Sequence, residues 1–347
     1  MESAGVVRHR ELRGKRQRPD PKFYAGSGKV AEIRAAADEL NAAFVVFNHE
    51  LSPAQQRNIE KEVQRRVLDR TEVILEIFGQ RARTAEGKVQ VELARLEHLS
   101  TRLIRGWTHL ERQRGGFGAT GGPGETQLEL DRRYIGQRVK TLKAKLVQLR
   151  KQRQVQRRAR ARGDVLSVAI VGYTNAGKST LFNALAHARA YEADQLFATL
   201  DTTTRRVWLR DAGNITVSDT VGFIRELPHK LVAAFRATLE ETVQADLLLH
   251  VVDASSPVRD AQEQAVNEVL AEIPAGQAPQ LLVWNKIDAA SLEAGVERDQ
   301  YGRISRVFVS ARSGAGMEEL RDAIAEFAQS RKASEAGAPE SQSLQPH

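Results

Sequence analysis

The sequence predicts an α/β fold in two parts: a small N-terminal α/β domain with a long helical hairpin, then a domain built on a mostly parallel sheet. Three observations support this. An apolar, β-branched run over 165–171 precedes a glycine-rich loop and a helical segment, the order found in parallel sheets. Helical and strand-like stretches alternate over 28–66. Apolar residues recur at helical spacing over 128–149, as at the seam between paired helices.

Composition narrows the class of protein. The 347 residues are enough for two domains or more, and 41% hydrophobic residues can form a core. No run of 18 apolar residues indicates a membrane span, the N-terminus carries no apolar signal segment, and the chain has no cysteine. We therefore expect a cytoplasmic protein without disulfides or thiolate metal sites. The net charge of +8 is local, because residues 132–162 hold 13 Lys or Arg and no acid.

The N-terminal part alternates helices and strands. We expect a helix over 28–40, a strand over 43–47 and a helix over 54–66, the last opened by Ser52 as N-cap. Residues 70–105 predict helix with an interruption near Gly87. The expected domains are 1–110 (α/β domain and first hairpin helix), 111–163 (glycine-rich loop and basic second hairpin helix), 164–330 (second folded domain) and 331–347 (disordered tail).

The loop between the hairpin helices has two open interpretations. Six glycines and a proline within 115–124 exclude a helix or central strand. The loop is either a flexible hinge or a contact loop, in which backbone lies close to nucleotide or RNA and flanking arginines meet phosphate. In the basic run that follows, 31 residues without a carboxylate would repel one another unless a polyanion binds them, which favours nucleic acid over a solvated face. The candidate RNA contacts are Arg112, Arg114, Arg132, Arg133, Arg150, Lys151 and Arg153.

A phosphate-binding loop follows the strand at 165–171. Residues 172–180 contain G-x-x-x-x-G-K-S, in which glycines let backbone N–H groups point at phosphate oxygens and the following helix adds its dipole. Lys178 adds a point charge, and Ser179 is a ligand for Mg²⁺. The expected contacts are Gly172, Tyr173, Thr174, Asn175, Ala176, Gly177, Lys178, Ser179 and Thr180.

A second motif, Asn285-Lys-Ile-Asp288, follows another predicted strand and selects guanine. The Asp288 carboxylate can accept both the N1–H and the N2 amino hydrogens of guanine, a donor pair that adenine lacks. Lys286 packs its stem across the base, and Asn285 ties this loop to the phosphate loop. Such charge-assisted pairs contribute roughly 1.5–3 kcal/mol each, and adenine would leave the carboxylate buried without a partner.

Two more strand ends complete the set. Asp219 would hold Mg²⁺ through water, and the amide of Gly222, three residues on, would contact the γ-phosphate. Ser310 and Ala311 would contact guanine O6 through their backbone. The four elements, in order and each at a strand end, predict a GTP-binding domain. A further motif must supply a threonine for the Mg²⁺ shell, but four threonines fall within 197–205, so spacing cannot choose between them.

Three smaller expectations concern the same domain. Residues 205–210 and 215–219 should form a hairpin, the one antiparallel pair in the sheet. His250, inside the strand predicted over 247–253, is expected in the core rather than as a ligand. A closing helix is expected over 317–329.

Together these motifs resemble the HflX family of ribosome-associated GTPases. The resemblance spans Arg18 to Ser330 and is carried by Arg18-Pro-Asp-Pro, Tyr24-Ala-Gly-Ser-Gly-Lys-Val, Gly122-Pro-Gly-Glu-Thr-Gln-Leu-Glu129, Phe197-Ala-Thr-Leu-Asp and Asp219-Thr-Val-Gly-Phe-Ile224. It implies an N-terminal HflX domain joined to a Ras-like P-loop GTPase domain that hydrolyses GTP with Mg²⁺. It further implies binding to the large ribosomal subunit and its rRNA, with dissociation or rescue of stalled ribosomes under stress.

The resemblance also bears on single residues. Similarity to the related Obg pattern favours Thr199 as the Mg²⁺ threonine, next to Phe197 in the nucleotide site, and Lys178, Thr199 and Gly222 would be the catalytic residues. Gly121 stands where family members usually carry arginine. Phe223 stands where Ras-like enzymes carry the glutamine that orients water. It is either a packing residue or the mark of a switch kept slow until a partner, the ribosome, supplies the missing group; both predict weak intrinsic turnover.

Two other function classes stay open. One is a GTP-dependent signalling switch with a protein or membrane effector, docked through the basic helix. The other is an RNA-remodelling NTPase that also uses ATP, although no second phosphate loop is visible. We expect a monomer that binds RNA and not DNA, with peripheral membrane association as an alternative.

Overall fold

The structure, a computed structural model, describes residues 9–113, 127–160, 165–186, 197, 199–224, 242–273 and 278–336; the side chains of 103–128, 150, 153–160 and 334–336 are not described. The chain divides into two compact units, and the first division along the sequence falls between Val155 and Gln156. The boundary expected between 163 and 164 falls outside the described residues, so it stays a prediction.

The first unit begins with a small α/β layer. Helix α1 (Ser27–Glu39) precedes strand β1 (Phe44–Val46), helix α2 (Pro53–Val63) precedes strand β2 (Arg66–Leu68), and the two strands pair in parallel. Ser52 caps α2: its hydroxyl accepts the N–H of Gln55 while the Gln55 side chain accepts the N–H of Ser52, a capping box. The helix ends three residues before the predicted Arg66, because Gln64 takes φ +54° and the chain turns into β2.

Two helices form over residues 70–105, the region expected to be helical with an interruption near Gly87. Helix α3 (Arg70–Arg81) stops where Ala82 takes an extended conformation, and helix α4 (Ala85–Gln113) starts after Thr84, whose hydroxyl accepts the N–H of Gly87 at 2.9 Å. The interruption therefore lies before Gly87 rather than at it, because Gly87 is held in the first turn of α4.

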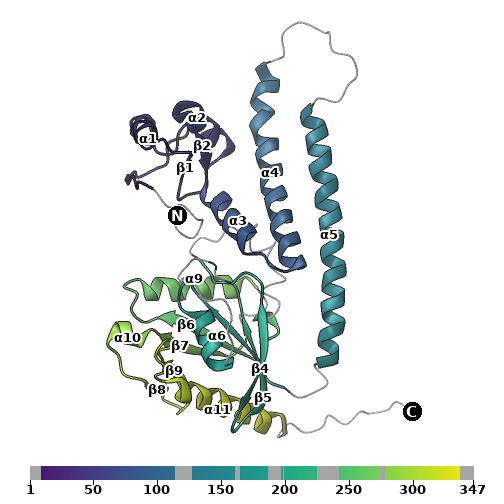
Figure 1. The fold of residues 1–347 in the computed structure, drawn as a ribbon, viewed down its shortest axis with the longest axis vertical. Coiled ribbons are helices and arrows are strands. Elements are labelled where there is room, and N and C mark those ends of the chain that lie inside the picture. The colour runs from purple at the N-terminus through teal and green to yellow at the C-terminus, as the bar shows by residue number, and fades with distance from the viewer. Residues whose placement is uncertain are drawn as a thin grey trace, which may run out of the picture. The chain divides into compact units, whose positions relative to one another are not determined.

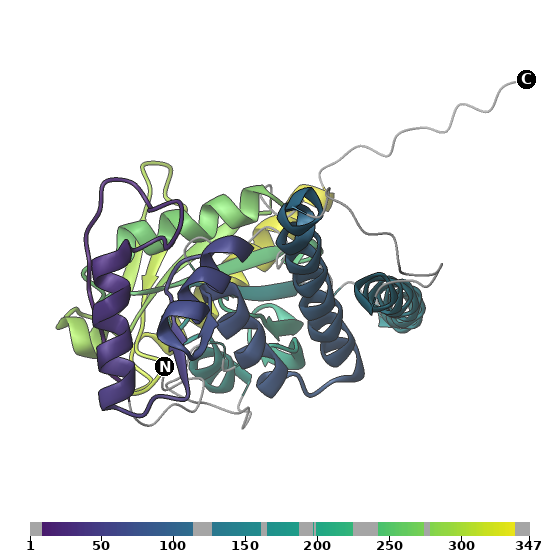
Figure 2. The same ribbon diagram turned by 90° about the horizontal axis from the view of Figure 1, so that it is seen from above.

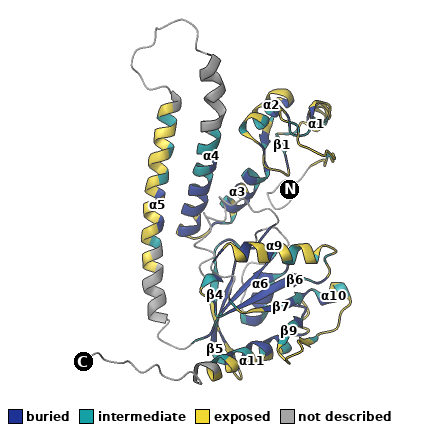
Figure 3. Cartoon of the chain, turned by 180° about the vertical axis from the view of Figure 1, so that it is seen from behind, coloured by how far each residue is buried: buried dark blue, intermediate teal, exposed yellow. Residues whose placement is uncertain are grey.

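Helix α5 (Gln127–Arg160) pairs with α4 along an apolar seam. Leu142 and Leu146 pack against Val89 and Leu93, and Val139 lies beside them. The two helices run side by side in opposite directions (Figure 1, Figure 2), which confirms the hairpin predicted from the spacing over 128–149. Most of the other described residues of α5 are exposed (Figure 3).

The second unit contains a seven-stranded sheet of order β4-β5-β3-β6-β7-β9-β8. Its strands are β3 (Ser167–Gly172), β4 (Thr203–Leu209), β5 (Gly213–Asp219), β6 (Leu247–Asp253), β7 (Gln280–Asn285), β8 (Gly295–Arg298) and β9 (Ile304–Phe308). The five inner strands are parallel, whereas β4 and β8 pair antiparallel at the two edges. The prediction of one antiparallel pair is therefore wrong. β8 was missed because its four residues are mostly exposed and carry no apolar run.

Helices cover both faces of this sheet. Helices α6 (Lys178–Ala186) and α11 (Met317–Ala336) share a core with Val168 and Ile170 of β3. Helix α9 (Arg259–Ala271) contacts β3 and β6 with residues outside that core, and it lies across the strands from α11 (Figure 1). A short α10 (Ile287–Ala290) follows β7. His250 in β6 is 1% exposed, which confirms it as a core residue.

The C-terminal helix is longer than predicted. Helix α11 continues to Ala336, seven residues past its predicted end at Gln329, so the start of the predicted disordered tail is helical; residues 337–347 lie outside the described chain. Among the described helices, none combines the length and the apolarity needed to cross a bilayer.

Candidate nucleotide site

Parallel strands bring the predicted motifs to one edge of the sheet. β3, β5, β7 and β9 run in the same direction, so the loops that follow their carboxyl ends lie together, where α/β sheets bind ligands. A cavity of about 490 Å³ opens there. It is lined by Thr174, Asn175, Gly177, Lys178, Ser179, Thr180, Phe197, Thr199, Thr220, Gly222, Asn285, Lys286, Asp288, Ala289, Ala311 and Arg312.

Most predicted site residues line this cavity, and five are not part of its lining: Gly172, Tyr173, Ala176, Asp219 and Ser310. Three lining residues were not predicted. Thr220 and Arg312 each directly follow a motif residue, so extending the motif by one position would have found them. Ala289 directly follows Asp288 in α10, so the same extension would have found it.

The phosphate loop needs glycine at its end. Gly177 has φ +90°, and a Cβ there would lie 2.2 Å from Nδ2 of Asn285, so a larger residue would push the two loops apart. Lys178 is 7% exposed, and its Nζ donates to the carbonyl of Tyr173 at 2.8 Å. Burial lowers the pKa of Lys178 to about 8, while the nearby Asp219 carboxylate opposes that shift.

Three oxygen-bearing side chains converge beside Lys178. Ser179 Oγ lies 2.8 Å from Thr199 Oγ1, and both hydroxyls donate to Oδ2 of Asp219 at 2.8 Å. The other carboxylate oxygen, Oδ1, is buried without a hydrogen-bond partner. Burial raises the pKa of Asp219, while the bonds from Ser179 and Thr199 and the charge of Lys178 oppose that shift.

This cluster favours one threonine. Thr199 contacts both Ser179 and Asp219, whereas Thr204 bonds to Ser218 at 2.9 Å. Hydroxyl and carboxylate oxygens are the donors that Mg²⁺ takes, and Mg²⁺ is held by few protein ligands because it keeps several waters. The orphaned Asp219 Oδ1 therefore fits such an ion, and among the described residues no group of three or more His, Asp or Glu offers an alternative.

The D-x-x-G segment lies against the phosphate loop. The N–H of Phe223 donates to the carbonyl of Gly172 at 3.1 Å, and the N–H of Thr174 donates to the carbonyl of Phe223 at 2.7 Å. A Cβ on Gly222 would fall 2.9 Å from Nζ of Lys178. The Phe223 side chain is 1% exposed, so it packs in the interior and cannot orient a water.

At the other end of the cavity one buried amide joins three loops. Asn285 is 2% exposed; its Nδ2 donates to the carbonyl of Ala176 at 2.9 Å, and its Oδ1 accepts the N–H of Ala311 at 3.0 Å. This is the tie to the phosphate loop that the sequence predicts, with a second tie to the Ser310-Ala311 pair. Asp288 is exposed at the cavity wall, so its carboxylate is accessible to a base.

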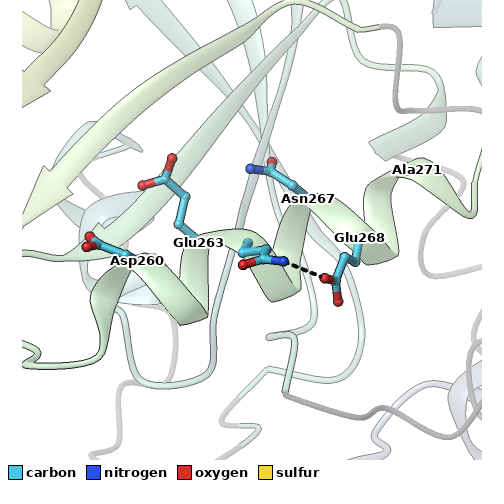
Figure 4. A pocket seen from close by; sticks show the side chains of 6 residues that line it. Asp260, Glu263, Asn267, Glu268 and Ala271 are labelled. Carbon is cyan, nitrogen blue, oxygen red and sulfur yellow. Dashed lines mark hydrogen bonds between the residues drawn. The ribbon is translucent and has the colours of Figure 1, made fainter.

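A second hollow, of about 530 Å³, lies along α9 (Figure 4). Its described lining comes from that helix alone and includes Asp260, Glu263 and Glu268, the last accepting a bond from Gln264 at 3.0 Å. Three carboxylates repel a nucleotide phosphate. Although this hollow is slightly larger, the nucleotide chemistry belongs to the cavity at the strand ends.

The predicted RNA contacts are only partly described. Arg132, Arg133 and Lys151 are exposed on α5. Arg112, Arg150 and Arg153 lie in the hairpin helices, but their side chains are not described; Arg114, Gly121 and the loop 115–124 lie outside the described residues. The sequence missed two ion pairs across the hairpin, Arg138 with Glu92 at 2.7 Å and Lys143 with Glu97 at 2.8 Å.

Known proteins match most of the chain. Family models described as GTP-binding GTPase N-terminal, GTP-binding GTPase middle region and 50S ribosome-binding GTPase match residues 1–79, 81–160 and 167–286. GTPase HflX of Escherichia coli (strain K12) is 54% identical over 327 residues, which cover 94% of this chain and 76% of that relative. This chain belongs to the HflX family of GTPases.

Other comparisons agree with the HflX assignment. GTPase HflX of Magnetococcus marinus is 50% identical over 326 residues, 93% of this chain and 75% of that relative. The crystal structure of SsGBP in complex with GDP is 25% identical, with a TM-score of 0.52, and covers 95% of this chain and 93% of that one. The predicted family, the two-part α/β fold and GTP hydrolysis are thereby confirmed.

Proposed function

We propose that this HflX-family GTPase binds the large ribosomal subunit by laying the exposed face of α5 against rRNA phosphates, and that GTP controls this contact. The proposal rests on a difference among the basic residues of α5: some form ion pairs with α4, and others are exposed. Arg138 and Lys143 are neutralised by α4, whereas Lys140, Lys145 and Lys151 are exposed and form no ion pair with a described residue. Unpaired cations on a rigid helix suit sequence-independent phosphate contact.

The nucleotide cavity would supply the control. Asp288 would read guanine, and Lys178 with the loop amides would hold the β- and γ-phosphates. Ser179 and Thr199 would ligate Mg²⁺ directly and Asp219 would hold it through water. When bound, this ion neutralises charge that develops on the phosphates during transfer.

The γ-phosphate would couple the cavity to the rest of the protein. Thr199 and Gly222 come from separate segments that both lie against the phosphate loop, so GTP would order both and its hydrolysis would release them. The outcome that we propose is dissociation or rescue of stalled ribosomes under stress, by a cytoplasmic monomer. The match to a 50S ribosome-binding GTPase model supports the partner.

A ribosome pelleting assay tests the contact. We expect binding to purified large subunits that is stronger with a GTP analogue than with GDP. Replacing Lys140, Lys145 and Lys151 together by glutamine should reduce the slope of log K against log salt by roughly two to three. The matched control replaces the paired Arg138 and Lys143, which should change the slope by less than about one. GTP affinity of the free protein should stay unchanged in both variants.

Two results would contradict the proposal. An unchanged slope in the triple variant would mean that the α5 face is only solvated. Equal or stronger binding to acidic liposomes than to large subunits would favour the membrane effector instead.

A further inference from the structure

A charged pair stands behind the base-binding lysine. β6 and β7 pair in parallel with Asp253 opposite Asn285, and the N–H of Ala254 donates to the Asn285 carbonyl at 2.9 Å. This register places the last residue of β6 beside the lysine of the N-K-x-D motif. Nζ of Lys286 donates to Oδ2 of Asp253 at 2.8 Å.

Asp253 is itself held in place. The N–H and the hydroxyl of Ser255 donate to its Oδ1 at 3.0 Å and 2.6 Å. One carboxylate oxygen is thus fixed by the turn after β6, and the other faces Lys286. Burial raises the pKa of Asp253, but the hydrogen bonds from Lys286 and Ser255 outweigh it and the net shift is downward, so the group is a carboxylate at neutral pH.

The two partners have different positions relative to the cavity. Lys286 lines it and Asp253 does not. Cε of Lys286 lies 4.0 Å from where a Cβ on Gly177 would stand, so the aliphatic stem runs beside the phosphate loop. The side chains of Lys286 and Asp253 are 31% and 18% exposed, and this partial burial screens the pair less than open solvent would.

We propose that Asp253 is a positioning residue for guanine nucleotides, which anchors the Lys286 ammonium so that the lysine stem is presented to the face of the base before the nucleotide arrives. This inference rests on the guanine site proposed above. A lysine without an anchor would have to be ordered by binding, at a cost equivalent to roughly a 3- to 10-fold loss of affinity. Because a stem stacks on any purine face, the loss should be the same factor for GTP, GDP and ITP.

A double-mutant cycle tests the inference. Asp253→Asn keeps the shape and removes the charge, and Lys286→Met keeps the stem and removes the ammonium. We expect Asp253→Asn to weaken GDP and GTP binding about 3- to 10-fold in the wild-type background. In the Lys286→Met background the same change should add less than about 2-fold, because the group that it anchors is gone. A purely structural role for Asp253 would give the same loss in both backgrounds and would overturn the inference.

Two further variants complete the experiment, one as a control and one as a substitute for Asp253→Asn. Asp246→Asn is the matched control, because Asp246 lies at the other end of β6, where it accepts the N–H of Ser167 at 2.8 Å and pairs with Arg331; it should leave nucleotide affinity unchanged. Ser255→Ala loosens Asp253 without changing charge, so it should give a smaller loss in the same direction and serves if Asp253→Asn does not fold. Tighter binding by Asp253→Asn would mean that the ion pair holds Lys286 away from the base.

Failure of the guanine site is distinguishable from failure of this inference. Asp288→Asn, measured alongside, should shift preference from GTP toward XTP. If it does and the cycle is additive, only the role of Asp253 is refuted; if it does not, the guanine site itself is wrong.

Discussion

Replacing Asn285 by alanine should damage both stability and nucleotide binding. The side chain is 2% exposed and satisfies two buried backbone groups, the Ala176 carbonyl and the Ala311 N–H. An orphaned buried group costs about 1–3 kcal/mol. Nδ2 lies within 2.2 Å of where a Cβ on Gly177 would stand, so the side chain fills the space between the loops. We therefore expect the free energy of unfolding to fall by about 2–5 kcal/mol, toward the low end if a water replaces the amide.

The assay compares nucleotide-free proteins by urea denaturation and then measures competition against a fluorescent GDP analogue. Affinity should fall at least about tenfold, because the loops holding phosphate and base lose their common tie. Asn285→Asp should be no milder, since it keeps the acceptor for Ala311 but sets a carboxylate oxygen against the Ala176 carbonyl. Asn214→Ala, at the exposed start of β5, is the control and should change stability by less than about 0.5 kcal/mol. A loss below about 1 kcal/mol in Asn285→Ala with unchanged affinity would refute the reasoning.

Three further outcomes are expected. Asp288→Asn should lose GTP affinity and gain XTP affinity in a competition assay, because an amide can donate to xanthine O2; unchanged preference would contradict the assignment. Isolated protein should turn over GTP far below the roughly 1–100 s⁻¹ of typical kinases, since Phe223 is buried, and large subunits should raise the rate; a phosphate-release assay showing no rise across salt conditions would exclude a ribosomal partner in hydrolysis. Burial lowers the pKa of His250 to about 4, so the unfolded chain binds a proton that the folded one does not between pH 6.5 and 4. The free energy of unfolding should therefore decrease as the pH is lowered through that window, by up to about 3 kcal/mol in total. In denaturation curves, His250→Gln should remove this part of the pH dependence, whereas the exposed His49→Gln should retain it.

Local patterns were enough for features that depend on neighbouring residues. The start of α2 follows from Ser52 as N-cap and Pro53 at the first helical position, two adjacent residues. The hairpin seam follows from the helical period, because Leu142 and Leu146 must share one face. The phosphate loop follows in the same way, because its glycine and lysine lie on one short turn between a strand and a helix.

The edge strands of the sheet and the ends of helices were harder to predict, because their residues bury little apolar surface and so produce no clear hydrophobic pattern. β8 forms through backbone pairing with β9 and has no buried residue to produce a pattern. The ion pairs of Arg138 and Lys143 were also invisible, because their partners Glu92 and Glu97 lie about 46 residues earlier on α4. The sequence therefore showed α5 as uniformly basic, and only the packed hairpin separated the two cations neutralised by α4 from the exposed lysines that form no ion pair with a described residue.

The sequence by itself determined the family, the order of the nucleotide motifs and the residue types that each supplies, because every motif is a short segment with its own chemistry. Tertiary structure decided which of the four threonines contacts Ser179 and Asp219. Thr199 is 20 residues from each of them in sequence, so the contact depends on where its segment returns to the edge of the sheet. It also decided that Asp253 stands beside Lys286. No local rule links them, because their contact is fixed by the register of two parallel strands whose connection is more than twenty residues long.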